Sequence, residues 1–296
     1  MKTEDSAQYQ YLPSPRRVFA LADLHLSLGN PSKDMGLISS GWKNYVERLQ
    51  EAWDQLVGPE DCVLIPGDVS WAMKTADAKI DLDWIDQRAG TKVISVGNHD
   101  YWWPSSYNKA RAFALQSTYI SDKGVIALGD AYLVVSIKGT DDPMLDFHDE
   151  IQWSQKSSRK EESLEEKTLV AKRLVKENER LARALGRLRA CDPEKKKTWI
   201  VMIHYPPTDP QRAQTQIFKQ LSEFAVDCVV FGHLHSLKES FLGYDFESKG
   251  LLAVRGEHNH CLDSNGDTLQ SALEPKRPIL HFVAADWLNF VPKQIY

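Results

Sequence analysis

The sequence predicts an α/β protein with mixed β-sheets, and the pattern of its apolar segments carries this prediction. Short and almost continuous apolar runs, typical of buried strands, occur at 18–22, 62–66, 92–96, 198–203 and 228–231. Longer segments with helical spacing lie between them, which favours sheets covered by helices. Residues 124–139 differ, because two apolar runs flank Gly129-Asp130 and so predict an antiparallel hairpin. Further strands near the C-terminus, without intervening helices, make a purely parallel sheet less consistent with the pattern.

The predicted helices are amphipathic. Apolar side chains recur three or four residues apart over 40–57, with Gly58-Pro59 as a stop signal. Weaker patterns of the same kind cover about 75–88, 104–116 and 212–224.

A charged insertion occupies about 150–197. Its leucines fall near one helical face while Lys, Arg and Glu fill the rest, which predicts a long, solvent-exposed helix over 156–197. An alternative remains open, in which the basic end at Lys195, Lys196 and Lys197 attracts an anionic substrate.

Length and composition limit the class of protein. With 296 residues, of which 42% are hydrophobic, we expect a single domain over 1–296 with a polar N-terminal tail at 1–15. No run of about 18 apolar residues is present, and we expect a cytoplasmic protein without membrane insertion. The net charge of −5 argues against a general nucleic-acid partner. Of the four cysteines, Cys62 and Cys228 open apolar runs, so we expect reduced core thiols rather than disulfides.

Side chains that can bind metal follow the predicted strands. In open α/β sheets the binding crevice lies beyond the carboxyl ends of the strands. Carboxylate, amide and imidazole groups without thiolate favour zinc, iron or manganese, and their number suits two adjacent divalent ions. Two cations repel each other, so a carboxylate must bridge them, and Asp68 is the natural candidate. The ligand candidates are Asp23, His25, Asp68, Asn98, His204, His233 and His235.

Spacing alone does not identify such residues. Asp146-Phe147-His148 and His258-Asn259-His260 repeat the spacing of the candidate motifs, but no apolar run precedes them, so we do not expect them at the site. Gly67, Gly97 and Gly232 fit the interpretation, because a glycine lets the backbone turn sharply close to bound ions.

In chain order, the motifs DLH, GD, GNHD, IH and GHLH between residues 17 and 235 resemble the calcineurin-like metallophosphoesterase superfamily. The resemblance implies a four-layer αββα sandwich with two mixed β-sheets. It also implies two divalent metal ions and attack on phosphorus by a hydroxide that both ions hold. One ion would be held by Asp23, His25, Asp68 and His235, and the other by Asp68, Asn98, His204 and His233.

The resemblance further assigns two catalytic residues. His99 is similar to the family's histidine that protonates the leaving group, and we expect Asp100 to fix its tautomer and keep it cationic. Loop capping is the alternative role for Asp100. The aromatic residues Trp71, Tyr101 and Trp102 could form a substrate-binding wall beside the metals, with core packing as the alternative.

The second motif departs from the family pattern. It reads Gly67-Asp68-Val69-Ser70-Trp71, where much of the family has a second acidic residue and an arginine, and this argues against a protein serine/threonine phosphatase. We therefore predict a hydrolase that cleaves a phosphomonoester or phosphodiester of a small or medium-sized molecule. A nuclease, a pyrophosphatase acting on nucleotide-linked lipids and a non-catalytic scaffold are the alternatives.

Overall fold

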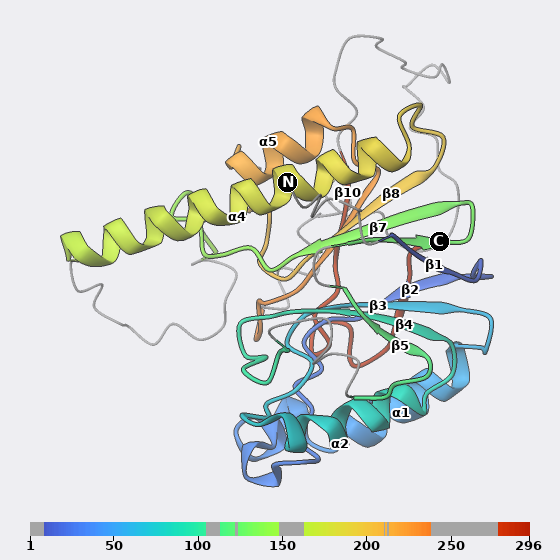
Figure 1. The fold of residues 1–296 in the computed structure, drawn as a ribbon. Coiled ribbons are helices and arrows are strands. Elements are labelled where there is room, and N and C mark those ends of the chain that lie inside the picture. The colour runs from blue at the N-terminus through green and yellow to red at the C-terminus, as the bar shows by residue number, and fades with distance from the viewer. Residues whose placement is uncertain are drawn as a thin grey trace, which may run out of the picture.

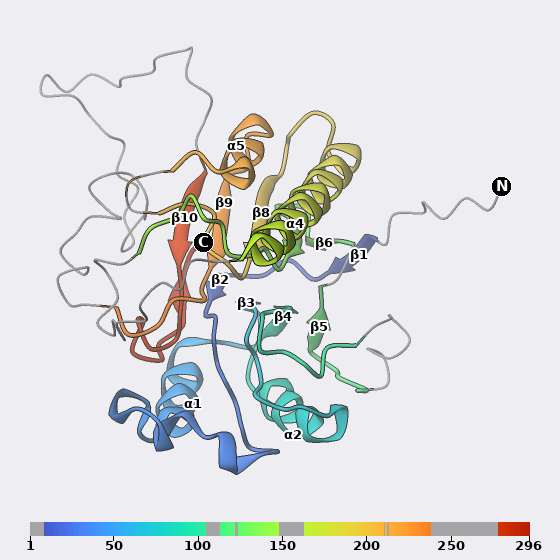
Figure 2. The same ribbon diagram turned by 90° about the vertical axis from the view of Figure 1, so that its left-hand side faces the viewer.

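The structure is a computed structural model that describes residues 9–104, 113–121, 124–147, 163–209, 211, 213–237 and 278–296. Its helices and sheets form four layers in the order helix, sheet, sheet, helix (Figure 1). Figure 2 shows the same layers from the side, with α1 and α2 below the two sheets and α4 and α5 above them. The predicted αββα sandwich is confirmed.

The lower sheet has five strands in the order β11-β2-β3-β4-β5. Strands β2 to β5 are parallel, and β11 pairs antiparallel with β2, so the sheet is mixed. The strands are β2 (Val18–Ala20), β3 (Cys62–Pro66), β4 (Thr91–Ser95), β5 (Thr118–Ile120) and β11 (Lys293–Gln294).

The upper sheet has six strands in the order β1-β6-β7-β8-β9-β10. The predicted hairpin over 124–139 is confirmed as the antiparallel pair of β6 and β7, and the other neighbours are parallel. The strands are β1 (Tyr9–Leu12), β6 (Val125–Leu128), β7 (Tyr132–Ile137), β8 (Thr198–Ile203), β9 (Cys228–Phe231) and β10 (Ile279–Phe282). Strand β1 lies within the expected polar tail at 1–15, and its pairing with β6 shows that this part of the segment belongs to the sheet.

Four α-helices cover the outer faces of the sheets in the described part of the chain. They are α1 (Tyr45–Leu56), α2 (Thr75–Asp86), α4 (Leu164–Cys191) and α5 (Gln216–Glu223). Helix α1 is shorter than the predicted 40–57, because Ser40–Trp42 forms a separate 3₁₀ turn and Asn44 adopts a left-handed conformation. Most of the helix predicted at 104–116 lies outside the described residues. No described helix has the length and hydrophobicity that crossing a membrane requires.

Three apolar clusters hold the layers together. One lies between the sheets, one under α1 and α2, and one under α4 and α5. Cys62 and Cys228 belong to the cluster between the sheets as free thiols, as predicted, whereas Cys261 lies outside the described residues. Burial of each large apolar side chain contributes about 1.5–3 kcal/mol, so these clusters form a rigid base for the strand ends.

The long helix α4 is only partly solvent-exposed. Its N-terminal half extends beyond the sheet, and Leu169 is exposed there (Figure 1). Leu181, Leu185 and Leu188 in its C-terminal half are fully buried against the upper sheet. The prediction of a solvated helix is therefore wrong for this half, because its leucine face packs on β7.

Candidate metal centre

The ends of five strands bring the seven predicted ligands together at one rim of the two sheets. Strands β2, β3 and β4 deliver ligands from the lower sheet, and β8 and β9 deliver the others from the upper sheet. Of the seven, Asp23, His25, Asp68 and His204 are almost fully buried. Two groups of donor atoms result, one around His25 and His235 and one around His204 and Asn98.

The first group contains Asp23, His25 and His235. The Nε2 atoms of His25 and His235 lie 3.0 Å apart, and His235 Nε2 is 3.7 Å from Asp23 Oδ1. His25 Nε2 is also 3.8 Å from Asp68 Oδ2. His235 Nδ1 donates to Asp286 Oδ1 at 2.9 Å, which leaves Nε2 without a proton in the neutral ring.

The second group contains Asn98, His204 and His233. Asn98 Oδ1 lies 2.7 Å from His204 Nε2 and 2.9 Å from His233 Nδ1, and these two nitrogens are 3.3 Å apart. His204 Nε2 is 3.4 Å from Asp68 Oδ2. Because Asp68 Oδ2 is close to ring nitrogens of both groups, its carboxylate lies between them.

These contacts fit a site for cations. The carbonyl of Pro66 can only accept, so His204 Nδ1 donates to it, and Nε2 of the neutral ring presents a lone pair to Asn98 Oδ1. Lone pairs at 2.7 Å repel each other unless a proton or a metal ion lies between them. The donor set is nitrogen and oxygen without thiolate, which suits zinc, iron or manganese.

The charge state of the two central carboxylates supports the same interpretation. Burial raises the pKa of Asp23 to about 7, with the nearby Asp68 adding to the rise. Burial also opposes ionisation of Asp68, but His204 and His25 lower its pKa well below the ordinary value. The pair therefore retains a proton near neutral pH, and a metal ion would displace it.

Unusual backbone conformations place the ligands. Asp23, His25, Asp68 and His233 all have φ between 45° and 76°, the left-handed region that non-glycine residues rarely adopt. Such residues persist only where the surrounding structure fixes them, and they concentrate at functional sites. A Cβ at Gly97 would overlap Asp68, and one at Gly232 would overlap Asp23, so glycine is required at both positions.

His99 lies beside the ligands, but Asp100 does not orient it. The His99 backbone N–H donates to Asp68 Oδ1 at 2.8 Å, and its ring centroid is 4.2 Å from that of Trp71. His99 Nδ1 is buried and has no hydrogen-bond partner among the described residues. Burial lowers the pKa of His99, and the neighbouring histidines lower it further.

The carboxylate of Asp100 instead fastens two loops to each other. It accepts hydrogen bonds from the backbone N–H groups of Val69, Ser70 and Gly97 at 2.9, 3.2 and 2.8 Å. It also accepts from Trp102 Nε1 at 3.1 Å. The expected contact with His99 is replaced by these bonds, because the loop turns the two neighbouring side chains in different directions.

The three predicted aromatic residues do not lie in one place. Trp71 stacks on the His25 ring at 4.9 Å, and Tyr101 is 59% exposed with its ring 6.2 Å from His99, so both lie near the ligands. Trp102 is 3% exposed and packs on Phe113, which makes it a core residue. The prediction of a substrate contact is therefore wrong for Trp102.

Sequence reasoning missed Asp286. Its carboxylate accepts from His235 Nδ1 and from the Ser236 backbone N–H at 3.1 Å, so it fixes the ring orientation of a candidate ligand. A signal was present, since Asp286 follows the apolar run at 279–285 as Asp23 follows its own run. No glycine or histidine accompanies it, and it is 51 residues from His235 in sequence.

The other motifs lie away from the ligands or outside the described residues. His148, His258, Asn259 and His260 lie outside the described residues. The lysines at 195–197 lie at the amino ends of β8 and β9, opposite the ligand rim. Lys195 is paired with Asp227, and Lys197 Nζ is 3.7 Å from Asp130, so this cluster does not line the centre.

The family model of calcineurin-like phosphoesterases matches residues 16–237, about three quarters of the chain. Together with the sandwich fold and the ligand groups, this match identifies the protein as a member of that family.

Two curated relatives are phage proteins. The Gene 66 protein of Mycobacterium phage L5 is 44% identical over 52 residues, which are 18% of this chain and 25% of the relative. The Gene 66 protein of Mycobacterium phage D29 is 34% identical over 83 residues, or 28% and 40% of the two chains. The chain thus matches less than half the length of either relative.

Two solved structures show distant likeness. The phosphopantetheinyl hydrolase of Mycobacterium tuberculosis is 16% identical with a TM-score of 0.43, covering 75% of this chain and 83% of its own. A protein of unknown function from Aquifex aeolicus is 11% identical with a TM-score of 0.39, covering 94% and 95%.

Proposed function

We propose that the protein hydrolyses a phosphoester of a small or medium-sized molecule at a centre for two divalent metal ions. The observation that carries this proposal is the position of Asp68, whose Oδ2 lies 3.8 Å from His25 Nε2 and 3.4 Å from His204 Nε2. Asp23, His25, Asp68 and His235 would hold one ion, and Asp68, Asn98, His204 and His233 the other. Manganese, iron and zinc suit these donors. When bound, such ions activate water as a nucleophile and offset charge on the phosphoryl oxygens.

We assign protonation of the leaving oxygen to His99. Its backbone bond to Asp68 holds it next to the proposed bridging carboxylate, and Trp71 supports its ring. Because burial lowers its pKa, the ring gains a proton most readily beside added negative charge, such as that of a phosphoryl group. A proton held in this way is readily passed to a departing alkoxide.

In this proposal, Asp100 holds the loops after β3 and β4 in place and does not select the tautomer of His99. By accepting from Val69, Ser70 and Gly97, it fixes the segments that carry Asp68 and Asn98 relative to each other. Asp286 holds His235 so that Nε2 points towards His25 and Asp23, with which it would hold an ion. Trp71 and Tyr101 flank the leaving-group side beside His99.

The test compares bond class and metal in one assay. Chelator-treated protein is titrated with manganese, zinc or magnesium and assayed on 4-nitrophenyl phosphate, bis(4-nitrophenyl) phosphate and a dinucleotide. We expect metal to restore hydrolysis of at least one of the first two esters. Preference for the dinucleotide would favour the nuclease alternative. Metal binding without any hydrolysis would favour the scaffold and contradict the proposal.

A further inference from the structure

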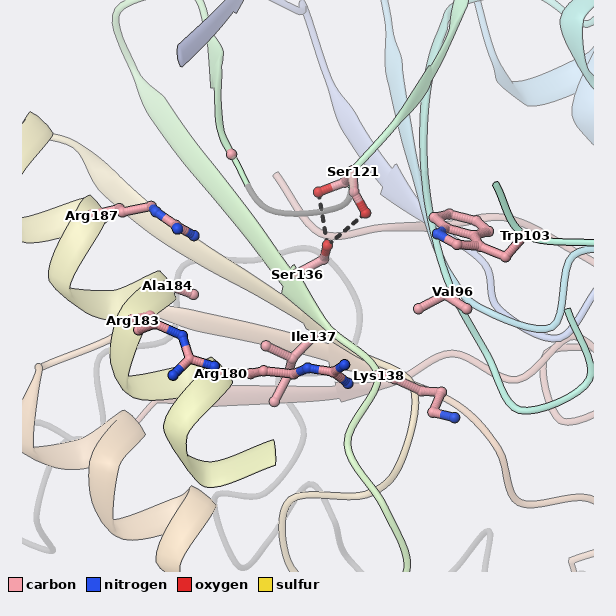
Figure 3. A pocket seen from close by; sticks show the side chains of 11 residues that line it. Val96, Trp103, Ser121, Ser136, Ile137, Lys138, Arg180, Arg183, Ala184 and Arg187 are labelled. Carbon is pink, nitrogen blue, oxygen red and sulfur yellow. Dashed lines mark hydrogen bonds between the residues drawn. The ribbon is translucent and has the colours of Figure 1, made fainter. Parts of the chain in front are cut away.

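A pocket lies beside the loops that carry the candidate metal ligands. It is a pocket of about 340 Å³ between the C-terminal half of α4, the end of β7 and the end of β4. This volume is at the lower end of the range for small-molecule sites. In Figure 3, three arginines extend from α4 towards β7, with Val96 and Trp103 on the opposite side.

The pocket adjoins the loops that carry the ligands. Val96 lines it and directly precedes Gly97 and Asn98. Lys138 also lines it, and the Lys138 carbonyl accepts from the backbone N–H groups of His204 and Tyr205, both at 3.1 Å. The pocket therefore borders the backbone segments that carry Asn98 and His204.

Among the residues that the structure describes, four cationic side chains and no carboxylate line the pocket. Arg180, Arg183 and Arg187 are spaced i, i+3 and i+7, which places them on one face of α4. Lys138 joins them from the end of β7 (Figure 3). Guanidinium groups present several fixed N–H donors and bind phosphate and carboxylate in a bidentate way.

Two glutamates of α4 pair with arginines that line the pocket. Glu177 pairs with Arg180 and also accepts from the Gly139 backbone N–H at 3.2 Å, so it anchors α4 to the loop after β7. Glu179 Oε2 is 3.5 Å from Arg183, and both of these side chains are more than half exposed. Among the described residues, these glutamates pair with Arg180 and Arg183, and Lys138 adds a further positive charge to the pocket wall.

The remaining walls suit a short linking group. Ile137 and Val96 are apolar, and the two buried hydroxyls at the pocket, Ser121 and Ser136, are hydrogen-bonded to each other at 2.8 Å (Figure 3). These hydroxyls are already satisfied, so the arginines are the main polar partners that the pocket offers.

We propose that this pocket binds a second anionic group of the substrate, a phosphate or a carboxylate, at a distance from the phosphoryl group that is hydrolysed. The proposal rests on the proposed function and narrows its substrate class to phosphoesters with two separate anionic groups. Within the protein, α4 then supplies specificity, while the strand ends supply the chemistry.

The test uses alkanediol bisphosphates, ω-carboxyalkyl phosphates and simple alkyl phosphates of matched length as substrates. We expect kcat/KM for the better of the two series with a second anionic group to exceed that of the alkyl phosphates by roughly tenfold or more. Arg180→Gln combined with Arg183→Gln should bring this ratio towards one. Arg189→Gln is the matched control, because Arg189 is on the same helix but packs over Trp199 and Phe224.

Arg183→Gln alone provides a second variant that keeps the Glu177 anchor, should the double variant fold poorly. Hydrolysis with no preference for substrates that carry a second anionic group would overturn the inference. A preference that both variants retain would also overturn it. If no ester is hydrolysed, the proposed function fails, and calorimetric binding of an alkanediol bisphosphate decides about the pocket. Binding that weakens at high salt and in the variants supports it, and no binding overturns it.

Discussion

Asp192 and Asp23 are buried carboxylates at opposite rims of the sandwich, and their pKa values are shifted in opposite directions. Before the amino end of β8 in the upper sheet, Asp192 accepts from the backbone N–H groups of Lys196 and Lys197, both at 2.9 Å, and from Trp199 Nε1 at 3.0 Å. These bonds outweigh burial and lower the pKa of Asp192. After the carboxyl end of β2 in the lower sheet, burial raises the pKa of Asp23 to about 7.

The hydrogen-bond partners of the two clusters distinguish a structural polar group from one that can bind a ligand. Around Asp192, every acceptor has a protein donor, so the cluster is complete and stabilises the fold. Around Asp68, ring nitrogens of histidine and the side-chain oxygen of Asn98 face each other, so a proton or a metal ion must lie between them. The first kind of site fastens a strand, and the second kind binds a ligand.

Of the substitutions at the two rims, Asp68→Asn should have the largest effect on activity. It removes the charge that both ligand groups share, and we expect kcat/KM to fall by roughly a thousandfold or more. Steady-state assays with saturating manganese, together with thermal unfolding, measure the effect. Near-wild-type turnover in a folded variant would be incompatible with a shared carboxylate.

His99→Ala tests the leaving-group role. We expect turnover of alkyl phosphates, whose alkoxides need a proton, to fall by roughly a hundredfold. Turnover of 4-nitrophenyl phosphate should fall much less, because nitrophenolate leaves without protonation. Equal losses for the two substrates would remove the assignment of His99 as the acid.

Asp286→Asn tests the support of a ligand from outside the centre. We expect metal affinity to weaken by roughly ten- to a hundredfold, with activity recovering as metal is added. Calorimetric titration of manganese and activity at rising metal concentration measure both quantities. If the variant unfolded more easily but bound metal as well as the wild type, Asp286 would be a structural residue only.

Asp192→Ala changes the rim opposite the ligands, and we expect it to have the smallest effect on activity. It leaves the buried Trp199 Nε1 and two backbone N–H groups without their acceptor, so we expect the free energy of unfolding to fall by about 1–3 kcal/mol. Urea unfolding measures this loss, and kcat/KM should stay at the wild-type value. A selective loss of activity would show that the two rims are coupled.

Much of the fold and most of the site could be predicted from local sequence signals. The strands are short apolar runs, and the residues after them must meet where the strands end, so Asp23, Asn98 and His204 were found from their positions alone. The prediction was wrong where it depended on the direction in which a side chain points. Asp100 adjoins His99 in sequence, but the turn sends its carboxylate to Val69, Ser70 and Gly97.

Other features depend on which face of an element is covered. The leucine pattern of α4 predicted a helix, but only its packing on β7 shows that Leu181 is buried while Arg180 and Arg183 border a pocket. Asp286 meets His235 through tertiary structure, across 51 residues. No periodicity encodes either contact.

The most direct test of the central claim is anomalous diffraction from crystals soaked in manganese. We predict two peaks, one among Asp23, His25 and His235 and the other among Asn98, His204 and His233, with the Asp68 carboxylate between them. A single peak, or manganese bound away from these side chains, would contradict the account.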